Sequence, residues 1–247
     1  MINTETKRKL RELNLDEINQ ILEQHDHNSD TLLLPFDERF QLIIDFIYQE
    51  KHNKRVQNLL TRAKLRITEA DMTGIIYDQR GIERHVLQEL GTCQFIQRCT
   101  NIIFQGFTGS GKTFLACAIG KEACKKGLRT RYIRIPDLLL ERDAATLVQG
   151  AVSKLLTKYA NFDILILDEW LLDDLSESDL HFLFELTERR YDSGSTIYCT
   201  QFRKQDWHQR LGGGVHADAM MDRIVHNAVW YDTGTLNMRE QQAKIFN

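Results

Sequence analysis

One glycine-rich stretch limits what this chain can fold into: Gly106-Phe107-Thr108-Gly109-Ser110-Gly111-Lys112-Thr113. It follows a short apolar run at residues 102–104 and opens a segment, Phe114 to Lys126, whose composition favours a helix. Strand, glycine-rich loop and helix in this order are typical of a P-loop, which binds phosphate groups. The glycines allow a tight turn in which successive backbone N–H groups point inward. The plainer alternative is an ordinary strand-to-helix turn with an exposed lysine.

The residues of this motif have distinct expected roles. Backbone N–H groups from Gly106 to Phe114, at the N-terminus of the expected helix, bind phosphate oxygens. Lys112 brings a positive charge to the outer phosphates and takes part in catalysis, and the Thr113 hydroxyl binds Mg²⁺. The cofactors expected from the motif are therefore ATP and Mg²⁺.

A second motif is an acidic pair, Asp168-Glu169, which directly follows four apolar residues at 164–167. Such a run suits a central parallel strand that is buried on both faces. Ligands of open α/β sheets bind outside the carboxyl ends of the strands, so the pair is expected beside the nucleotide. Asp168 would hold Mg²⁺, and Glu169 would deprotonate the attacking water. The alternative is a solvated acidic pair at a strand end.

Composition excludes several classes of protein. The 247 residues are 42% hydrophobic and 27% charged, which is typical of a globular chain. No apolar run approaches the ~20 residues that span a bilayer, and the N-terminus has no apolar core of a signal peptide. We therefore expect a cytoplasmic protein without a membrane partner. The five cysteines show no C-x-x-C spacing, so neither a zinc site nor a disulfide framework is indicated.

The pattern of apolar residues predicts two domains, residues 1–67 and 68–247. The first lacks strand-like alternation and reads as a small all-helical domain that binds DNA or a partner. The second alternates strands and helices, which indicates an α/β fold with a parallel sheet between helices. Five strands are expected, at 101–105, 129–134, 163–168, 195–200 and 226–231. Helices are expected after them, at 112–126, 145–159, 176–192, 204–211 and 217–225.

A basic segment lies at the end of the first domain. Between residues 51 and 66 the chain has six cations and no acidic residue, and a continuous helix is expected there. The cations are Lys51, Lys54, Arg55, Arg62, Lys64 and Arg66. They are candidate contacts to DNA phosphates, since base-reading motifs are absent and contacts to phosphates are largely non-specific in sequence. A charged helix face that only contacts solvent is the alternative.

Three further polar residues are weaker candidates. Gln201 ends an expected strand, where a polar side chain can sense the γ-phosphate and position the water. Arg223 lies on a short expected helix and would act as an arginine finger on a neighbouring subunit's nucleotide. The alternative for Arg223 is a surface salt bridge with Asp222 or Asp218. Arg239 is a candidate second sensor that contacts the nucleotide.

The quoted motifs resemble the IstB family of transposition helper ATPases, relatives of the DnaC helicase loaders within the AAA+ class. The similarity is carried by "NIIFQGFTGSGKTFLACAIGKEACKKGLRTRYIR", "DILILDEW", "STIYCTQF" and "DWHQRLGGGVHADAMMDRIVHNA". It implies a five-stranded parallel sheet with AAA+ strand order and a homo-oligomer with ATP between subunits. It also implies binding to double-stranded DNA and delivery of a partner protein. By position, Gln201 matches the first sensor and Arg223 the arginine finger.

Several functions remain open at this level. The leading interpretation is an ATPase that assembles on DNA and assists a transposase. The runner-up is a DnaC-like loader of a replicative helicase, and no motif in the sequence separates the two. A small P-loop kinase would need an acceptor pocket and has less need of Glu169. A module that binds ATP without hydrolysis would need no Glu169 at all.

Overall fold

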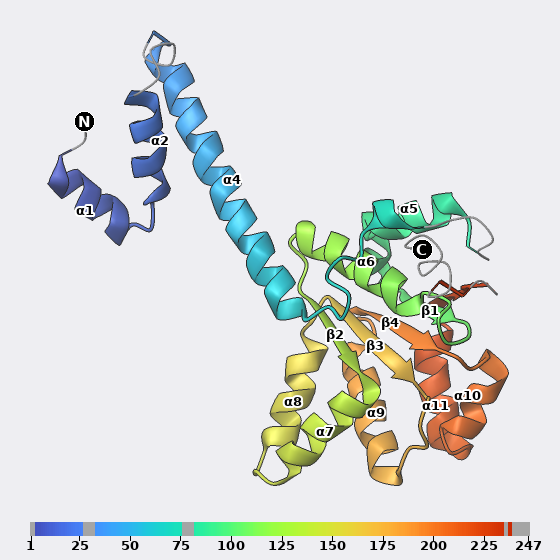
Figure 1. Ribbon diagram of the computed structural model, residues 1–247. Coiled ribbons are helices and arrows are strands. Elements are labelled where there is room, and N and C mark those ends of the chain that lie inside the picture. Colours follow the sequence, from blue (N-terminus) through green and yellow to red (C-terminus); the bar gives the residue numbers. More distant parts are fainter. Residues whose placement is uncertain (1–2, 27–32, 76–81, 235–236, 239–247) are drawn as a thin grey trace, which may run out of the picture. The chain divides into compact units, whose positions relative to one another are not determined.

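The computed structural model describes residues 3–26, 33–75, 82–234 and 237–238, drawn as ribbons in Figure 1. The chain divides into two compact units, residues 1–58 and 59–247. The first unit therefore ends before the boundary expected after residue 67. Residues 59–67 belong to the second unit because Leu59, Ala63 and Leu65 pack into its core. A functional domain over residues 1–67 stays a prediction.

The first unit is helical, as expected. Helix α1 (Thr4–Glu12) begins at Asn3, whose side chain accepts a hydrogen bond from the Thr6 N–H at 2.7 Å. Helix α2 (Glu17–Asp26) packs on α4 (Phe36–Ala63) through an ion pair of 2.6 Å between Glu17 and Lys54. Within the described residues, no helix is both long and apolar enough to cross a membrane.

Helix α4 ends earlier than the sequence predicts. It runs without a break from Phe36 to Ala63. Lys64 then adopts a left-handed backbone conformation with φ of 49°, which stops the helix. The expectation of a basic helix through residue 66 is therefore wrong for Lys64 and Arg66. Lys51, Lys54, Arg55 and Arg62 do lie on the helix.

The second unit is built on a five-stranded parallel sheet in the order β2-β3-β4-β1-β5. The five expected strands are confirmed and shift by only one or two residues at their ends. They are β1 (Asn101–Gln105), β2 (Thr130–Arg134), β3 (Ile164–Trp170), β4 (Ser195–Thr200) and β5 (Ala228–Asp232). β1, β3 and β4 fill the middle of the sheet, and this explains the continuous apolar runs in their sequences.

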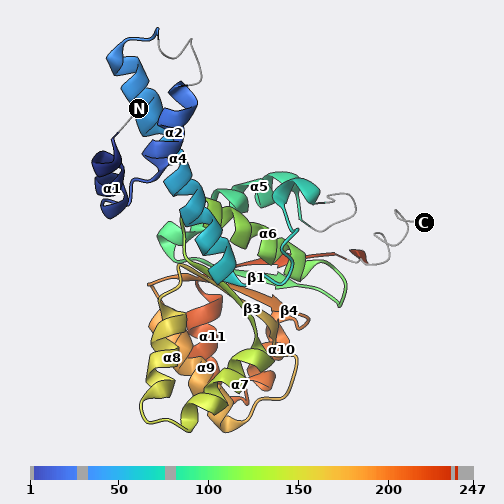
Figure 2. The same ribbon diagram turned by 60° about the vertical axis from the view of Figure 1, so that its left-hand side comes forward.

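Helices cover both faces of the sheet (Figures 1 and 2). On one face lie α5 (Arg84–Thr92) and α6 (Lys112–Lys125), with the short 3₁₀ helices η1 (Met72–Gly74) and η2 (Gln94–Arg98). On the other face lie α7 to α11. Neighbouring strand residues enter opposite cores: Ile164 and Ile166 face α6, whereas Leu165 and Leu167 face the other layer. The sheet is thus buried on both faces.

One helix was absent from the prediction. Helix α7 (Ile135–Thr146) follows β2 directly, and α8 (Ala151–Ala160) begins only after Gly150, whose φ is 74°. The sequence predicted a single helix over 145–159. Pro136 lies in the first turn of α7, where a missing N–H costs no hydrogen bond. The remaining helices are α9 (Glu177–Arg190), α10 (Lys204–Arg210) and α11 (Gly214–Val225).

The core beneath α9 to α11 contains a compact aromatic cluster. The ring centroid of Trp170 lies 4.8 Å from that of Tyr198 and 5.8 Å from that of Trp207. Trp230 extends the cluster at 5.1 Å from Trp207. Trp170 and Trp207 are fully buried. All three tryptophans of the chain therefore lie in one place, although they are far apart in sequence.

Arg190, at the end of α9, is a buried cation inside the same unit. Its guanidinium donates to the Phe162 carbonyl at 2.8 Å, to the Ser195 carbonyl at 2.6 Å and to the Thr196 hydroxyl at 2.9 Å. Burial lowers its pKa to about 10. Arg190 thus ties the loop before β3 to the start of β4.

Candidate nucleotide-binding site

The glycine-rich loop connects β1 to α6 as the motif predicts. Gly109 and Gly111 have backbone φ angles of 91° and 89°, which residues with a Cβ rarely adopt. Gly106 is needed for a different reason: a Cβ there would lie 2.2 Å from the Thr233 hydroxyl oxygen. The loop therefore keeps its shape only with glycine at these positions. Its backbone N–H groups and the N-terminus of α6 form the kind of concave surface that holds phosphate oxygens.

Lys112 lies at the centre of this loop. Its ammonium donates to the carbonyl oxygens of Gly106 at 2.7 Å and Phe107 at 2.8 Å. The side chain is buried, so its charge is directed to the loop and away from solvent. A phosphate group that enters the loop meets this cation.

Asp168 is held beside the loop by two hydroxyl groups. The Thr113 and Tyr132 hydroxyls donate to the same carboxylate oxygen, Oδ2, at 2.8 and 2.7 Å. Its other oxygen, Oδ1, accepts the Glu169 N–H at 2.9 Å. Burial and the neighbouring Asp168 carboxylate raise the pKa of Tyr132, which stays a hydrogen-bond donor. Asp168 and Thr113, both expected at a metal, are thus brought into contact across 55 positions of sequence.

These groups fit an Mg²⁺ ion. A hydroxyl and a carboxylate oxygen are hard ligands of the type that Mg²⁺ prefers. Among the described residues, no group of three or more histidine, cysteine, aspartate or glutamate side chains is arranged so that it could hold a metal ion. The donor set therefore suits an ion shared with substrate phosphates, and not a site made only of protein ligands.

Glu169 turns out of the strand into the cleft. Its φ is 60°, and the pairing of β3 with β4 is interrupted between Leu167 and Trp170. This bulge changes the direction of the side chain, a common device beside active sites. The Glu169 carboxylate lies 3.3 Å from the Arg66 guanidinium and 3.5 Å from that of Arg134.

A cleft of about 190 Å³ brings most of the expected residues together. Its walls come from the segment after α4, the glycine-rich loop, the start of α6 and the ends of β3 and β4. They include Arg66, Thr108, Gly109, Lys112, Thr113, Asp168, Glu169 and Gln201. Gln201 thus lies where a residue that senses the γ-phosphate is expected, and its role stays a prediction.

Arg223 is placed elsewhere. On α11 its guanidinium pairs with Glu188 at 2.9 Å and with Asp222 at 3.0 Å, and it stacks on the Tyr191 ring at 4.8 Å. Within one chain the arginine therefore forms the surface salt bridge that was the alternative interpretation, with Glu188 as an additional partner. Its role toward a neighbouring subunit stays a prediction. Arg239 lies outside the described residues.

Arg66, Tyr132 and Arg134 were not predicted at this site. Arg66 was assigned to the basic helix, but its Nη1 lies 3.3 Å from Glu169 Oε1. The pKa of Arg66 is raised, first by a hydrogen bond with the Tyr132 hydroxyl and then by Asp168 and Glu169. One signal in the sequence pointed to this: Leu65-Arg66-Ile67 alternates apolar and charged residues, which is typical of extended backbone.

The segment after β5 also contacts the glycine-rich loop. The hydroxyl of Thr233, which is fully buried, lies 2.6 Å from the Ser110 hydroxyl and 3.0 Å from the Gln105 carbonyl oxygen. The Met238 N–H donates to the Gly109 carbonyl at 2.9 Å. Ser110, the buried serine of the loop, is thus held in place by Thr233, which lies far along the chain.

Known proteins share this fold. A crystal structure of the DnaC helicase loader superimposes with a TM-score of 0.58 and 21% identity, over 66% of this chain and 96% of that chain. Together with the strand order of the sheet, the likeness confirms the expected AAA+ architecture.

Sequence relatives are closer. An insertion sequence ATP-binding protein of Sinorhizobium fredii is 30% identical over 217 residues, 88% of each chain. The ATP-binding protein of insertion sequence IS1162 from Pseudomonas fluorescens is 32% identical over 202 residues, 81% of this chain and 87% of that one. The family described as IstB-like ATP binding protein matches residues 8–245. The chain therefore belongs to the family of IstB-like ATP binding proteins.

Proposed function

We propose that this protein is an Mg²⁺-dependent ATPase that assembles on DNA and assists a transposase. One observation carries the enzymatic part: Lys112, the Thr113–Asp168 pair and Glu169 line a single cleft. A P-loop that only binds nucleotide has no need of a carboxylate turned into the cleft by a strained backbone. The family and the insertion sequence relatives support ATP as the nucleotide and transposition as the setting.

The residues of the cleft divide the chemistry among them. The loop N–H groups and the Lys112 ammonium hold and neutralise the phosphates, and most of the catalysis of phosphoryl transfer is positioning and electrostatic stabilisation of this kind. Thr113 and Asp168 would hold Mg²⁺, which, when bound, neutralises charge on the phosphate oxygens. Glu169 accepts the proton of the attacking water, and Gln201 orients that water.

The DNA contact is proposed on α4. At 100° per residue, Lys51, Arg55 and Arg62 lie within about 40° of one another around the helix axis, and all three are exposed. Lys54 is partly neutralised by its ion pair with Glu17. We therefore assign the main phosphate contacts to Lys51, Arg55 and Arg62, with binding that is largely independent of DNA sequence.

A helicase loader remains the second candidate because the DnaC loader shares the fold. The insertion sequence relatives favour the transposase. A transposase reading frame next to the gene would support the first function, and its absence would favour the second.

ATP hydrolysis tests the enzymatic proposal. Wild type should release phosphate from Mg·ATP, and the rate should rise with duplex DNA. Lys112→Ala should bind a fluorescent ATP analogue at least tenfold more weakly, a loss of about 1.4 kcal/mol or more. Lys126→Ala, which removes an exposed lysine just beyond the same helix, is the matched control. Equal nucleotide affinity in Lys112→Ala and wild type would contradict the proposal.

A further inference from the structure

We propose that Arg66 is a positioning residue that holds Glu169 in a resting arrangement until Mg·ATP is bound. The inference rests on the proposed ATPase function. It concerns a residue from the segment after α4, outside every motif that identifies the nucleotide site.

The contacts of Glu169 define this resting arrangement. Arg66 Nη1 lies 3.3 Å from its Oε1, and Arg134 Nη1 lies 3.5 Å from its Oε2. Both oxygens of the carboxylate are thus paired with guanidinium groups. A general base must lie within hydrogen-bond reach of the water that it deprotonates, and both guanidinium groups compete for that position. Glu169 must leave at least one of them before it can act.

The same guanidinium affects the expected metal position. Arg66 Nη1 lies 3.9 Å from Asp168 Oδ2, the oxygen that also accepts the Thr113 hydroxyl. Two cations beside one carboxylate repel each other. In the absence of metal, Arg66 compensates the two carboxylates at the end of β3, which are costly without a cation. A divalent ion bound by Asp168 and Thr113 therefore weakens the hold of Arg66.

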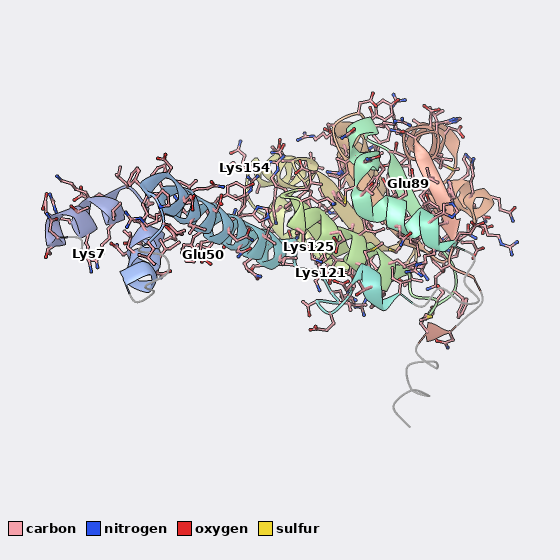
Figure 3. All side chains as sticks on the ribbon, turned by 90° about the horizontal axis from the view of Figure 1, so that it is seen from above. Lys7, Glu50, Glu89, Lys121, Lys125 and Lys154 are labelled. Carbon is pink, nitrogen blue, oxygen red and sulfur yellow. The ribbon has the colours of Figure 1, made fainter. Side chains whose placement is uncertain are left out.

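The backbone of Arg66 is fixed although its side chain is half exposed. Leu65 is buried and Ile67 packs on the same core. Gly120 on α6 lets Leu65 approach, since a Cβ at that position would lie 3.1 Å from Leu65 Cδ2. Lys121, labelled on α6 in Figure 3, donates to the Thr68 carbonyl at 3.3 Å. The side chain of Arg66, 48% exposed, can swing over the cleft from a rigid attachment.

Arg134 is the less mobile of the two arginines. Its guanidinium makes two hydrogen bonds with Asp137, at 2.8 and 2.7 Å, in the first turn of α7. Among the described residues, the carboxylates within 4 Å of Arg66 are those of Asp168 and Glu169 themselves. Release of Glu169 is therefore assigned to movement of Arg66.

The test compares Arg66→Gln, Arg66→Lys and the control Lys126→Gln in the full-length protein. The control removes one positive charge from an exposed position just beyond α6. Two quantities are measured without DNA: kcat and KM for ATP, and the Mn²⁺ concentration at half-saturation with ADP bound, by electron paramagnetic resonance. Half-exposed ion pairs are weak, so Arg66→Gln should raise kcat by about two- to fivefold and leave KM within about twofold. It should also lower the half-saturating Mn²⁺ concentration by a similar factor.

Arg66→Lys keeps the charge and should stay near wild type in both measurements, as should Lys126→Gln. A kcat of Arg66→Gln that is unchanged or lower would overturn the inference, and a loss of tenfold or more would assign Arg66 to the nucleotide instead. If wild type releases no phosphate from ATP, the proposed function fails, and the Mn²⁺ titration alone decides for Arg66. Unchanged Mn²⁺ binding in Arg66→Gln would then overturn it.

Discussion

Glu169 shows how one residue is prepared for a reaction. A left-handed conformation at a residue with a Cβ costs on the order of 1 kcal/mol, and it persists only where the surroundings enforce it. Here the neighbouring strand does so, since the Thr200 hydroxyl donates to the Trp170 carbonyl at 3.0 Å beyond the bulge. The conformation directs the carboxylate into the cleft and not along the sheet.

Glu169→Gln should separate binding from hydrolysis. The amide has nearly the size of the carboxylate but cannot accept the proton of water, so turnover should fall by ~10²-fold or more. Affinity for ATP should change little because Lys112 and the loop are intact. Phosphate release and nucleotide titration measure the two quantities. Hydrolysis at the wild-type rate would remove Glu169 from the mechanism.

Arg190→Lys tests the buried cation. Lysine cannot reach all the acceptors that the guanidinium joins, and buried carbonyl groups left without a donor cost about 1–3 kcal/mol each. We expect a loss of about 2 kcal/mol or more in the free energy of unfolding, measured by urea titration with circular dichroism. Arg189→Lys is the control, because Arg189 pairs with Glu185 near the surface, where the loss should be within about 0.5 kcal/mol. Equal losses would contradict this account.

Sequence was enough to expect that residues of the short motifs lie together, whereas their roles stay predictions. Lys112, Thr113, Asp168 and Glu169 follow strands whose apolar runs are unmistakable, so their meeting at one edge of a parallel sheet could be inferred. Arg66 reaches the site by the path of the chain after α4, and the alternation at residues 65–67 indicates extended backbone there without showing where it leads. Its charge resembled that of its helical neighbours, and the sequence therefore placed it among them.

At the scale of elements, buried strands were the most predictable and helix limits the least. The predicted helix over 145–159 merged part of α7 with α8, since Gly150 is a single weak break in a long helix-forming stretch. Composition predicts a basic helix up to residue 66, because the run of basic residues contains no signal for the end of a helix. Its actual end, at Lys64, depends on a backbone conformation that lysine seldom adopts.

Helix α4 leads to a prediction on DNA binding. Arg55→Glu with Arg62→Glu reverses two charges on one exposed face, and binding that depends on several phosphates should be lost while ATP binding is kept. Repetition of this face in an oligomer would make the contacts multivalent, so wild-type binding should require ATP and fall steeply with salt. A salt titration with labelled duplex DNA measures both effects.

The control for net charge is Lys126→Glu with Lys154→Glu, two exposed lysines of the second unit, one of them labelled in Figure 3. This variant should bind DNA nearly as wild type does. If the Arg55 and Arg62 variant binds equally well, α4 presents only a solvated face, and the DNA site must lie on the ATPase domain away from α4.

For the whole molecule, we propose that the nucleotide binds at one edge of the sheet, and the resemblance predicts that a neighbouring subunit completes the site. Arg223→Ala subunits should then bind ATP but hydrolyse it poorly. Mixing them with Lys112→Ala subunits should restore part of the activity, because some composite sites keep both groups. Phosphate release from the mixture measures this, with each variant alone as control.

Failure of the mixture to regain activity, once mixed oligomers are demonstrated, would leave Arg223 with the role visible in one chain. There it pairs with Glu188 and Asp222 on the surface of α9 and α11. Assembly is the property that sequence predicts only through resemblance, since a surface arginine in a salt bridge and an arginine finger have the same local pattern.

The aromatic cluster gives the molecule a built-in optical signal. Because Trp170, Trp207 and Trp230 are the only tryptophans, intrinsic emission excited near 295 nm arises from one cluster in the second unit. Trp170 directly follows Glu169 and lines the nucleotide cleft. Nucleotide binding should therefore change the tryptophan emission. A ligand that contacts only α4 does not touch the tryptophan cluster and should leave the emission unchanged. The unlabelled protein can thus report which of its two proposed ligands has arrived.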